Sequence, residues 1–327
     1  MNNIKKLTAA FMAVLLLFSL AACGDKTDSE TTEEYLTETA SSYIRDEKTK
    51  IAAVDGAIGF GITKFSVDRN YNYETEFLAD ESEAVSHLKA GTADIATLSV
   101  DTAANLYNET NGAIKLLAVN GLGFYHVIEN GENIQSITDL KGKTVYAAYQ
   151  GTNFEKVINY ILAQNGIDPE KDINLQFKAT DKEVAELTAS EADICILPEP
   201  YASKVVNNEE SFRKALDLNA EWNKISETPL AQRVVVARTE YINANPDIIK
   251  EFLGFNKISV NYLITNTYGA PLFLKDNGFC ETATLATELL IGNNLGFIDG
   301  EEMKTAVSAV LSNVYQISVD DGFWYNN

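Results

Sequence analysis

The sequence is poor in the side chains that build metal centres and nucleophilic active sites. It has three cysteines and two histidines in 327 residues, and neither His87 nor His126 has a cysteine close by. Zinc and haem sites need such residues at short spacings, so we expect no metal ion and no other cofactor. There is no G-x-S-x-G elbow and no P-loop lysine, and Gly56, Gly59 and Gly61 lack dinucleotide-binding spacing. An enzyme is therefore poorly supported.

Only two cysteines, Cys195 and Cys280, lie beyond the N-terminal region. Cys195 falls in an apolar run, where a free buried thiol is the simpler expectation. An exported protein could instead pair it with Cys280, and the sequence leaves both states open. Two cysteines do not make a disulfide framework.

Positive charge is scarce as well, with 26 lysines and arginines against 47 acidic residues and a formal net charge of −21. Such a chain is not expected to bind nucleic acid through counterion release, and anionic lipid headgroups would repel it. Apolar residues make up 46% of the chain, enough to fill more than one core. A mature length of about 300 residues exceeds what one core usually supports, so two lobes are expected.

The N-terminal segment has the three parts of a secretory signal. Lys5 and Lys6 precede an uncharged apolar run, and Leu-Ala-Ala stands directly before Cys23. The run is too short to span a bilayer comfortably. The residues around Cys23 resemble the bacterial lipobox, in which this cysteine becomes the lipidated first residue; an ordinary signal peptide is the alternative. We expect a signal peptide at 1–22, a lipidated flexible tether at 23–49, and anchoring at the outer face of the cell membrane.

Beyond the tether, apolar strands alternate with amphipathic helices. Short units of this kind predict an α/β fold with mostly parallel sheets and helices on both faces. The expected strands are 51–54, 73–78, 93–98, 114–119, 124–128, 144–148, 173–177, 193–197 and 234–236, and the expected helices are 81–89, 100–107, 153–165 and 182–188. Everything after residues 245–246 is expected to be helical.

One internal match indicates that a module is used twice. Residues 88–98 (LKAGTADIATL) align without gaps to residues 187–197 (LTASEADICIL). Both segments have the pattern of a helix end, a tight turn and a buried strand. Such self-similarity favours two similar α/β lobes, one around each segment.

Candidate binding residues lie where predicted strands end, because ligands of open α/β sheets bind beyond the carboxyl ends of strands and at helix N-termini. Four junctions of this kind occur, two in each predicted lobe, and a ligand held between the lobes would touch all four. The candidates are Asp55, Gly56, Ala57, Ile58, Ser99, Asn120, Gln150, Gly151, Thr152, Asn153, Glu199 and Tyr201. At any single junction, helix capping by a side chain such as Ser99 or Thr152 is the simpler role.

From about residue 50 onward, several motifs are similar to those of lipid-anchored substrate-binding proteins of ABC importers. The resemblance is to the nitrate/sulfonate/taurine and thiamine-precursor group. It rests on the order and spacing of residues 88–95 (LKAGTADI), 137–144 (ITDLKGKT), 197–203 (LPEPYAS), 245–253 (NPDIIKEFL), 297–304 (FIDGEEMK) and 320–325 (DDGFWY).

This resemblance implies the type II periplasmic-binding-protein fold, two α/β lobes joined by two crossing strands. The first lobe would be 50–124 and 236–327, and the second 125–235, with crossings near Phe124-Tyr125 and Val234-Val235. The resemblance also implies a protein, expected to be a monomer, that closes on a small-molecule solute. It would deliver this solute to an ABC permease and its ATPase. A surface receptor for solute sensing, or an enzyme related to the pyrimidine synthases, is the alternative, although the Cys-rich motif of those synthases is absent.

The resemblance says less about the solute. Sulfonate binders of this family often have Lys or Pro before Gly-Ser, where this chain has Gln150, Gly151 and Thr152. Lysine and arginine are absent from all four junctions, and Lys64 and Arg233 are the nearest cations. Aromatic residues are common near the junctions, and Glu199 could accept a hydrogen bond from an amino group. We therefore expect a pyrimidine-like or amino-bearing organic solute over a sulfonate or nitrate.

Overall fold

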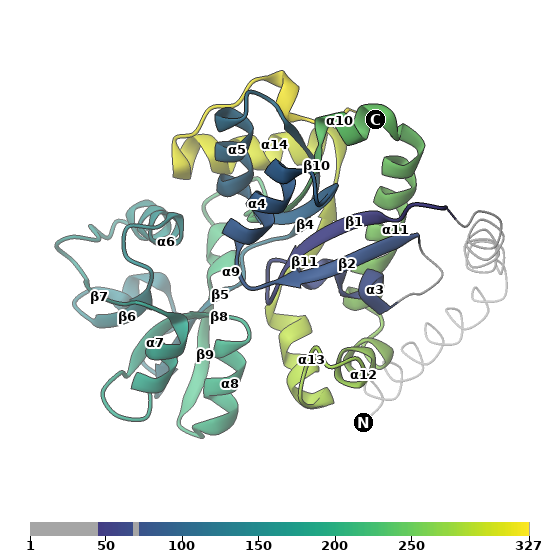
Figure 1. The fold of residues 1–327 in the computed structure, drawn as a ribbon. Helices are drawn as coiled ribbons and strands as arrows, with labels where there is room; N and C mark the ends of the chain where they lie inside the picture. The colour runs from purple at the N-terminus through teal and green to yellow at the C-terminus, as the bar shows by residue number, and fades with distance from the viewer. Residues whose placement is uncertain (1–44, 68–71, 327) are drawn as a thin grey trace, which may run out of the picture. The chain divides into compact units, whose positions relative to one another are not determined.

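The computed structural model describes residues 45–67 and 72–326 (Figure 1). The predicted signal peptide, Cys23 and the tether up to residue 44 lie outside the described residues. From Thr49 onward, the described chain forms one compact unit. Among the helices of that part of the chain, none has the length and apolar character needed to cross a bilayer.

The first sheet has six strands in the order β11-β4-β10-β3-β1-β2 (Figure 1). The strands β1, β2 and β3 run parallel to one another, and β10 is antiparallel to both β3 and β4. The sheet is therefore mixed, where the sequence predicted a mostly parallel one. Its strands are β1 (Thr49–Val54), β2 (Tyr73–Leu78), β3 (Ile95–Ser99), β4 (Ile114–Gly121), β10 (Arg233–Arg238) and β11 (Leu295–Ile298).

The second sheet has five strands in the order β7-β6-β8-β5-β9. It repeats the arrangement of the first sheet, with three parallel strands followed by one antiparallel strand. Its strands are β5 (Tyr125–Asn130), β6 (Thr144–Ala148), β7 (Asn174–Lys178), β8 (Ile194–Pro198) and β9 (Phe212–Asp217).

The internal sequence match coincides with equivalent positions in the two sheets. In both copies a helix ends, the chain turns, and the third parallel strand follows: β3 in the first sheet and β8 in the second. Each of these strands then pairs with the antiparallel strand next to it, β10 or β5. The prediction of one module used twice is confirmed.

Helices connect the strands and cover the sheets. Asp80 caps one of them by accepting hydrogen bonds from the backbone N–H groups of Ser82 and Glu83. Pro246 begins the longest helix, at a position where its missing N–H costs nothing. The helices are α3 (Thr63–Val67), α4 (Glu81–Ala90), α5 (Val100–Glu109), α6 (Asn153–Gln164), α7 (Asp181–Leu187), α8 (Tyr201–Asn208), α9 (Leu218–Trp222), α10 (Thr239–Ala244), α11 (Pro246–Thr265), α12 (Gly269–Asp276), α13 (Ala283–Gly292) and α14 (Gly300–Val310), with short turns at Phe60–Ile62, Ile137–Leu140, Leu311–Tyr315 and Asp321–Phe323.

Every strand and helix predicted by its residue range is present, with ends shifted by two residues at most. Two strands were missed. The prediction that everything after residues 245–246 is helical is wrong at β11, a four-residue strand that pairs with β4. The strand β9 carries Arg213 and Lys214 in its centre, so its sequence lacks the apolar pattern of the other strands. Long-range pairing with β5 decides its conformation instead.

The chain passes from the first sheet to the second between Gly121 and Tyr125, and it returns between Asp217 and Arg233. The predicted crossing at Val234-Val235 falls inside β10, whose residues pair with β3 and β4 in the first sheet. The return to the first sheet therefore comes before Val234. We propose that each sheet is the centre of one lobe, with β10 assigned to the first. Buried apolar side chains from both sheets belong to one continuous cluster, so the lobes share packing.

Candidate functional site

A cavity of about 360 Å³ collects side chains from both sheets and from the segments that connect them. We call it the aromatic cavity, because five of its residues are phenylalanine or tyrosine. None of its described lining residues is a lysine or an arginine. They are Ile58, Glu81, Ser99, Asp101, Thr102, Phe124, Tyr125, Tyr149, Thr152, Phe154, Gln232 and Tyr315.

One wall of the aromatic cavity is a stack of rings. The centroids of Tyr125 and Phe154 lie 3.7 Å apart in a stacked arrangement, and those of Phe124 and Tyr125 lie 4.7 Å apart. The guanidinium carbon of Arg233 lies 5.0 Å from the centroid of Phe124. Tyr125 begins β5 and Phe154 lies in α6, so both rings of this closest pair come from the second lobe. Such a wall suits a flat or cationic group.

The opposite wall is acidic. Glu81 is the first residue of α4, and its carboxylate accepts hydrogen bonds from the backbone N–H and hydroxyl of Ser99 and from the hydroxyl of Thr102. Burial raises the pKa of the Glu81 carboxyl, and the nearby Asp101 raises it further. The hydrogen bonds from Ser99 and Thr102 act in the other direction. A solute that carries positive charge would favour the ionised form of Glu81.

Tyr149 lies at the exposed rim of the cavity, beside a third carboxyl group. Burial raises the pKa of the Asp181 carboxyl to about 7, while its hydrogen bond with Tyr149 lowers it. Burial also raises the pKa of the Tyr149 phenol, as does the nearby Asp181. Asp181 begins α7 and is almost fully buried. The region around the cavity is therefore acidic on the side of the second lobe as well.

Several backbone donors at the helix starts beside the cavity are occupied within the chain. In α5, the N–H of Ser99 donates to Glu81 and the N–H of Val100 donates to the carbonyl of Gln232 at 2.9 Å. Before α6, the N–H of Gly151 donates to Glu155 at 2.6 Å, and the N–H of Thr152 donates to the carbonyl of Tyr149. Helix N-termini bind anions through such groups, and these four are already used.

A second cavity, of about 460 Å³, lies on the other side of the loop after β1. Asp55, Gly56 and Ala57 line it, whereas the next residue, Ile58, lines the aromatic cavity. Its other walls come from the turn at Phe60–Ile62, from β2, from α8 and the loop before it, and from the segment that follows α12 and continues into α13. These walls include Phe60, Phe77, Glu199, Pro200, Lys204, Phe279, Cys280, Glu281, Leu285 and Leu289.

The structure therefore divides the sequence-predicted site residues between two cavities. Ile58, Ser99 and Thr152 line the aromatic cavity, and Asp55, Gly56, Ala57 and Glu199 line the second one. The other five candidates are Asn120, Gln150, Gly151, Asn153 and Tyr201. The side chain of Asn153 lies outside the described part of the structure, and the other four are not among the described lining residues of either cavity.

Three of these five have a clear setting. Asn120 is buried in β4 behind Gly61, and its amide has no hydrogen-bond partner among the described residues. Gln150 is exposed before α6, and the half-buried Tyr201 begins α8 and packs against the core of the second lobe.

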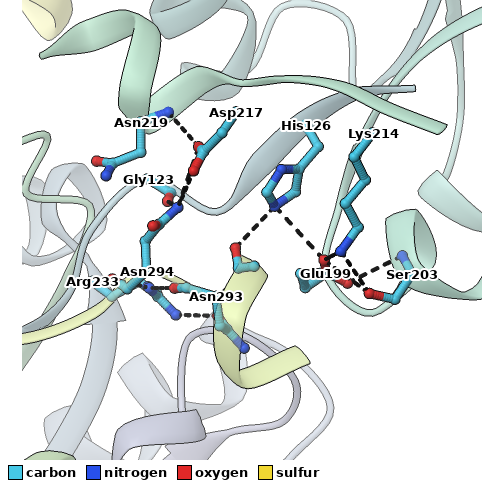
Figure 2. Close-up of polar contacts among 11 residues, drawn as sticks. Gly123, His126, Glu199, Ser203, Lys214, Asp217, Asn219, Arg233, Asn293 and Asn294 are labelled. Carbon is cyan, nitrogen blue, oxygen red and sulfur yellow. Dashed lines mark hydrogen bonds and ion pairs between the residues drawn. The ribbon is translucent and has the colours of Figure 1, made fainter. Parts of the chain in front are cut away.

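Glu199 is part of a buried polar network rather than a free acceptor (Figure 2). Lys214 of β9 forms an ion pair with its carboxylate, and Ser203 of α8 donates to it from both its N–H and its hydroxyl. Nε2 of His126 lies 3.7 Å from the same carboxylate and 2.9 Å from the carbonyl of Gly292. These contacts therefore do not favour the predicted role of Glu199 as an acceptor of hydrogen bonds from the solute.

The expectation that cations are absent from the four junctions is wrong. Lys214 reaches the junction after β8 from the neighbouring strand, and Lys204 lines the second cavity beside it. Because β9 was not recognised as a strand, the sequence offered no reason to place Lys214 next to Glu199. Only Phe212 and Leu216 of this strand are buried, so no simple alternation marks it.

Of the two nearest predicted cations, Arg233 is engaged within the chain, and Lys64 is not among the described lining residues of either cavity. Arg233 is buried, and its guanidinium donates to the carbonyls of Ala57 and Leu122 and to both the side chain and the carbonyl of Asn293 (Figure 2). Burial lowers the pKa of Arg233 to about 9. Lys64 lies over the ring of Tyr262, with Nζ 5.1 Å from the centroid.

Nine of the twelve described lining residues of the aromatic cavity were not among the sequence-predicted site residues, including Glu81, Gln232, Tyr315 and Phe154. Glu81 is 18 positions before Ser99 in the chain, and only the packing of α4 beside β3 brings them together. Within the described ranges, histidine, cysteine and carboxylate side chains form no group of three that could hold a metal ion. The free thiols Cys195 and Cys280 do not pair.

Comparison with protein-family models finds one match, over residues 66–253, more than half of the chain. The model is described as "ABC transporter, phosphonate, periplasmic substrate-binding protein". A search of the curated proteins finds no match.

Solved structures share the fold at low sequence identity. An ABC transporter protein from Parabacteroides distasonis matches with a TM-score of 0.72 and 21% identity, covering 86% of this chain and 100% of that one. The aliphatic sulphonate-binding protein SsuA of Escherichia coli matches with a TM-score of 0.66 and 15% identity, over 86% and 93% of the two chains. A ligand-binding component of an ABC-type import system from Staphylococcus aureus, solved with zinc bound, matches with a TM-score of 0.64 and 12% identity, over 86% and 97%.

Proposed function

Because this chain belongs to the family of ABC-transporter periplasmic substrate-binding proteins of the phosphonate type, we propose that it captures a neutral or amino-bearing organic solute in the aromatic cavity. It is the extracytoplasmic solute-binding component of an ABC importer, and it works with a membrane permease. The expected fold, two α/β sheets with helices, agrees with that of the solved neighbours. The finer placement in the nitrate/sulfonate/taurine and thiamine-precursor group is part of the proposal.

The single observation that carries the solute class is the composition of the aromatic cavity. Five rings and the carboxyl groups of Glu81 and Asp101 line it, and none of the described lining residues is a cation. A phosphonate, sulfonate or nitrate would enter with its charge uncompensated. An amino-bearing ring could stack on Tyr125 and donate to Glu81 or Asp101, at about 1.5–3 kcal/mol for each charged hydrogen bond.

The volume also sets a limit on the solute. A cavity of about 360 Å³ is at the small end of ligand sites, so it suits a single ring with short substituents. Its walls come from both sheets, so the solute contacts both lobes, as a ligand that favours closure must. No bond in the solute changes in this proposal, because binding and release suffice for import.

The experiment is isothermal titration of the purified mature protein with 4-aminopyrimidine, 4-aminopyridine, taurine, methanesulfonate, methylphosphonate and nitrate. We expect heat of binding only with the amino-bearing rings, and a loss of affinity of at least tenfold in Tyr125→Ala. Native mass spectrometry of freshly purified protein would show whether such a solute co-purifies unchanged. Tight binding of an oxyanion by the unaltered protein would disprove this solute class.

Transport and sensing are separated in cells. The proposal predicts that deleting the gene for this protein lowers uptake of the radiolabelled solute, and that the solute is recovered from the cells. A protein that serves only as a surface receptor would bind the same solute with no change in its uptake.

A further inference from the structure

We propose that Glu81 is a specificity-determining residue, which fills with its own carboxylate the position at the start of α5 where an oxyanion of a solute would bind. This inference rests on the proposed role of the aromatic cavity as the solute site. In this inference, the side chain of Glu81 keeps phosphonates and sulfonates from binding, although the model of this family is named for phosphonate.

The contacts of Glu81 are those of a bound oxyanion. Its two carboxylate oxygens accept from the backbone N–H of Ser99, from the Ser99 hydroxyl at 3.0 Å and from the Thr102 hydroxyl at 3.3 Å. A backbone N–H and two hydroxyls at a helix start are the groups that hold phosphate and sulfonate oxygens in proteins. All three donors point at Glu81, which also lines the cavity.

Ser99 shows that this arrangement differs from ordinary helix capping. A serine at the N-cap normally accepts a hydrogen bond from the first turn of its own helix. Ser99 is the N-cap of α5 and makes no such bond. Its hydroxyl is oriented toward Glu81 and Thr102 instead, the latter at 2.8 Å. The start of α5 is therefore arranged around an acceptor that comes from another helix.

Three further backbone donors beside the cavity are already used within the chain. The N–H of Val100 is used by Gln232, and those of Gly151 and Thr152 are used by Glu155 and Tyr149. An oxyanion would have to displace a chain carboxylate or carbonyl, and it would lie beside Asp101 with none of the described lining residues supplying a positive charge. Removing the Glu81 carboxylate is the one change that frees three donors together.

A purely structural role for Glu81, tying α4 to α5, makes a different prediction. Under that role, any replacement would lower stability and weaken all binding alike. Under the present proposal, Glu81→Ala changes the preferred ligand toward oxyanions, because the freed donors can donate hydrogen bonds to an oxyanion of the ligand. Glu81→Gln retains the side-chain length, so it removes the charge without opening the position.

The test is titration of methylphosphonate and of 4-aminopyridine into the mature protein and three variants: Glu81→Ala, Glu81→Gln and Glu83→Ala. Glu83 is the matched control, since it is exposed, lies on the same helix and does not line the aromatic cavity. We expect Glu81→Ala to bind methylphosphonate at least tenfold more tightly than the unaltered protein. Neither Glu81→Gln nor Glu83→Ala should gain affinity for it. Melting curves establish that each variant is folded.

Two results would overturn the inference: a folded Glu81→Ala variant without gain for methylphosphonate, or an equal gain in Glu83→Ala, which would indicate a general effect of net charge. Should Glu81→Ala fail to fold, Glu81→Ser, with a small polar side chain, is titrated in its place. The proposed solute class is judged separately, by binding of 4-aminopyridine to the unaltered protein. If the unaltered protein does not bind 4-aminopyridine, the proposed solute class is wrong. The affinity of Glu81→Ala for methylphosphonate still decides the role of Glu81.

Discussion

Gly292 and Glu199 lie in direct contact, although one ends α13 and the other follows β8 in the second sheet. A methyl group added at Gly292 would lie 2.3 Å from a carboxylate oxygen of Glu199 and 3.1 Å from Nζ of Lys214. The carbonyl of Gly292 also lies 2.9 Å from Nε2 of His126 in β5. The helix α13 thus packs on the polar network around Glu199 through Gly292, a residue without a side chain.

Gly292→Ala should therefore destabilise the protein, by about 1–3 kcal/mol, because the added methyl group cannot fit without displacing Glu199. Denaturant unfolding measures the change. Gly254→Ala is the matched control, since Gly254 lies exposed inside α11 and an added methyl group would meet no atom within 4 Å. That variant should be more stable than the parent, by about 0.5–1 kcal/mol. Equal effects of the two substitutions would contradict the packing described for Gly292.

Lys214→Met should cost about 3 kcal/mol, because it leaves the buried carboxylate of Glu199 without its ion-pair partner. In the double variant with Glu199→Gln the loss should be smaller than the sum of the single losses, since no buried charge is left unpaired. Thermal and denaturant unfolding provide the measurement. Lys204→Met serves as control, because that lysine is largely exposed and its pair with Glu281 is long, at 4.0 Å. Its change should stay below about 0.5 kcal/mol.

The stability of the protein should depend on the ionisation of Asp181 between about pH 4 and pH 7. Burial raises the pKa of this carboxyl from 3.8 to about 7, so the unfolded chain ionises first as the pH rises. Stability contributed by the protonated form is present below pH 4 and is lost as the pH rises to 7. Asp181→Asn should thus stabilise the fold at pH 8, by at most about 4 kcal/mol, with little effect at pH 4.

Measurement of unfolding free energies at several pH values checks this dependence. Glu186→Gln, on the same helix but exposed and paired with Lys182 at 3.8 Å, should show no comparable change with pH. A difference between Asp181→Asn and the parent that is the same at pH 4 and pH 8 would be inconsistent with the raised pKa.

Lipid attachment is predicted at Cys23. Cys23→Ser should release the protein from the membrane fraction, because the diacylated cysteine would be its only anchor. Fractionation of cells followed by detection of the protein provides the test. Cys280→Ser, which changes a cysteine far from the N-terminus, should stay membrane-bound. A Cys23→Ser protein that is retained in the membrane would exclude the lipobox interpretation.

Local patterns in the sequence were sufficient for most of the fold. The apolar runs and the match of residues 88–98 to 187–197 predicted the alternating elements and the repeated module. These features depend on interactions between residues near one another in the chain. The same is true of the strand-end junctions, and three of the residues expected there, Ile58, Ser99 and Thr152, line the aromatic cavity.

The tertiary structure decided the elements and contacts that depend on distant partners. The strand β9 forms because β5 pairs with it, and β11 forms because β4 does. The same pairing places Lys214 on Glu199, which changes a presumed ligand acceptor into half of a buried ion pair.

The chemistry of the aromatic cavity was likewise decided by packing. Glu81 reaches Ser99 only because α4 packs beside β3, and Tyr315 joins the cavity from the turn at Leu311–Tyr315, which follows α14. By itself, the sequence determined where the chain would present backbone donors. Only the tertiary structure decided which groups occupy them, because that choice depends on side chains that meet across long stretches of sequence.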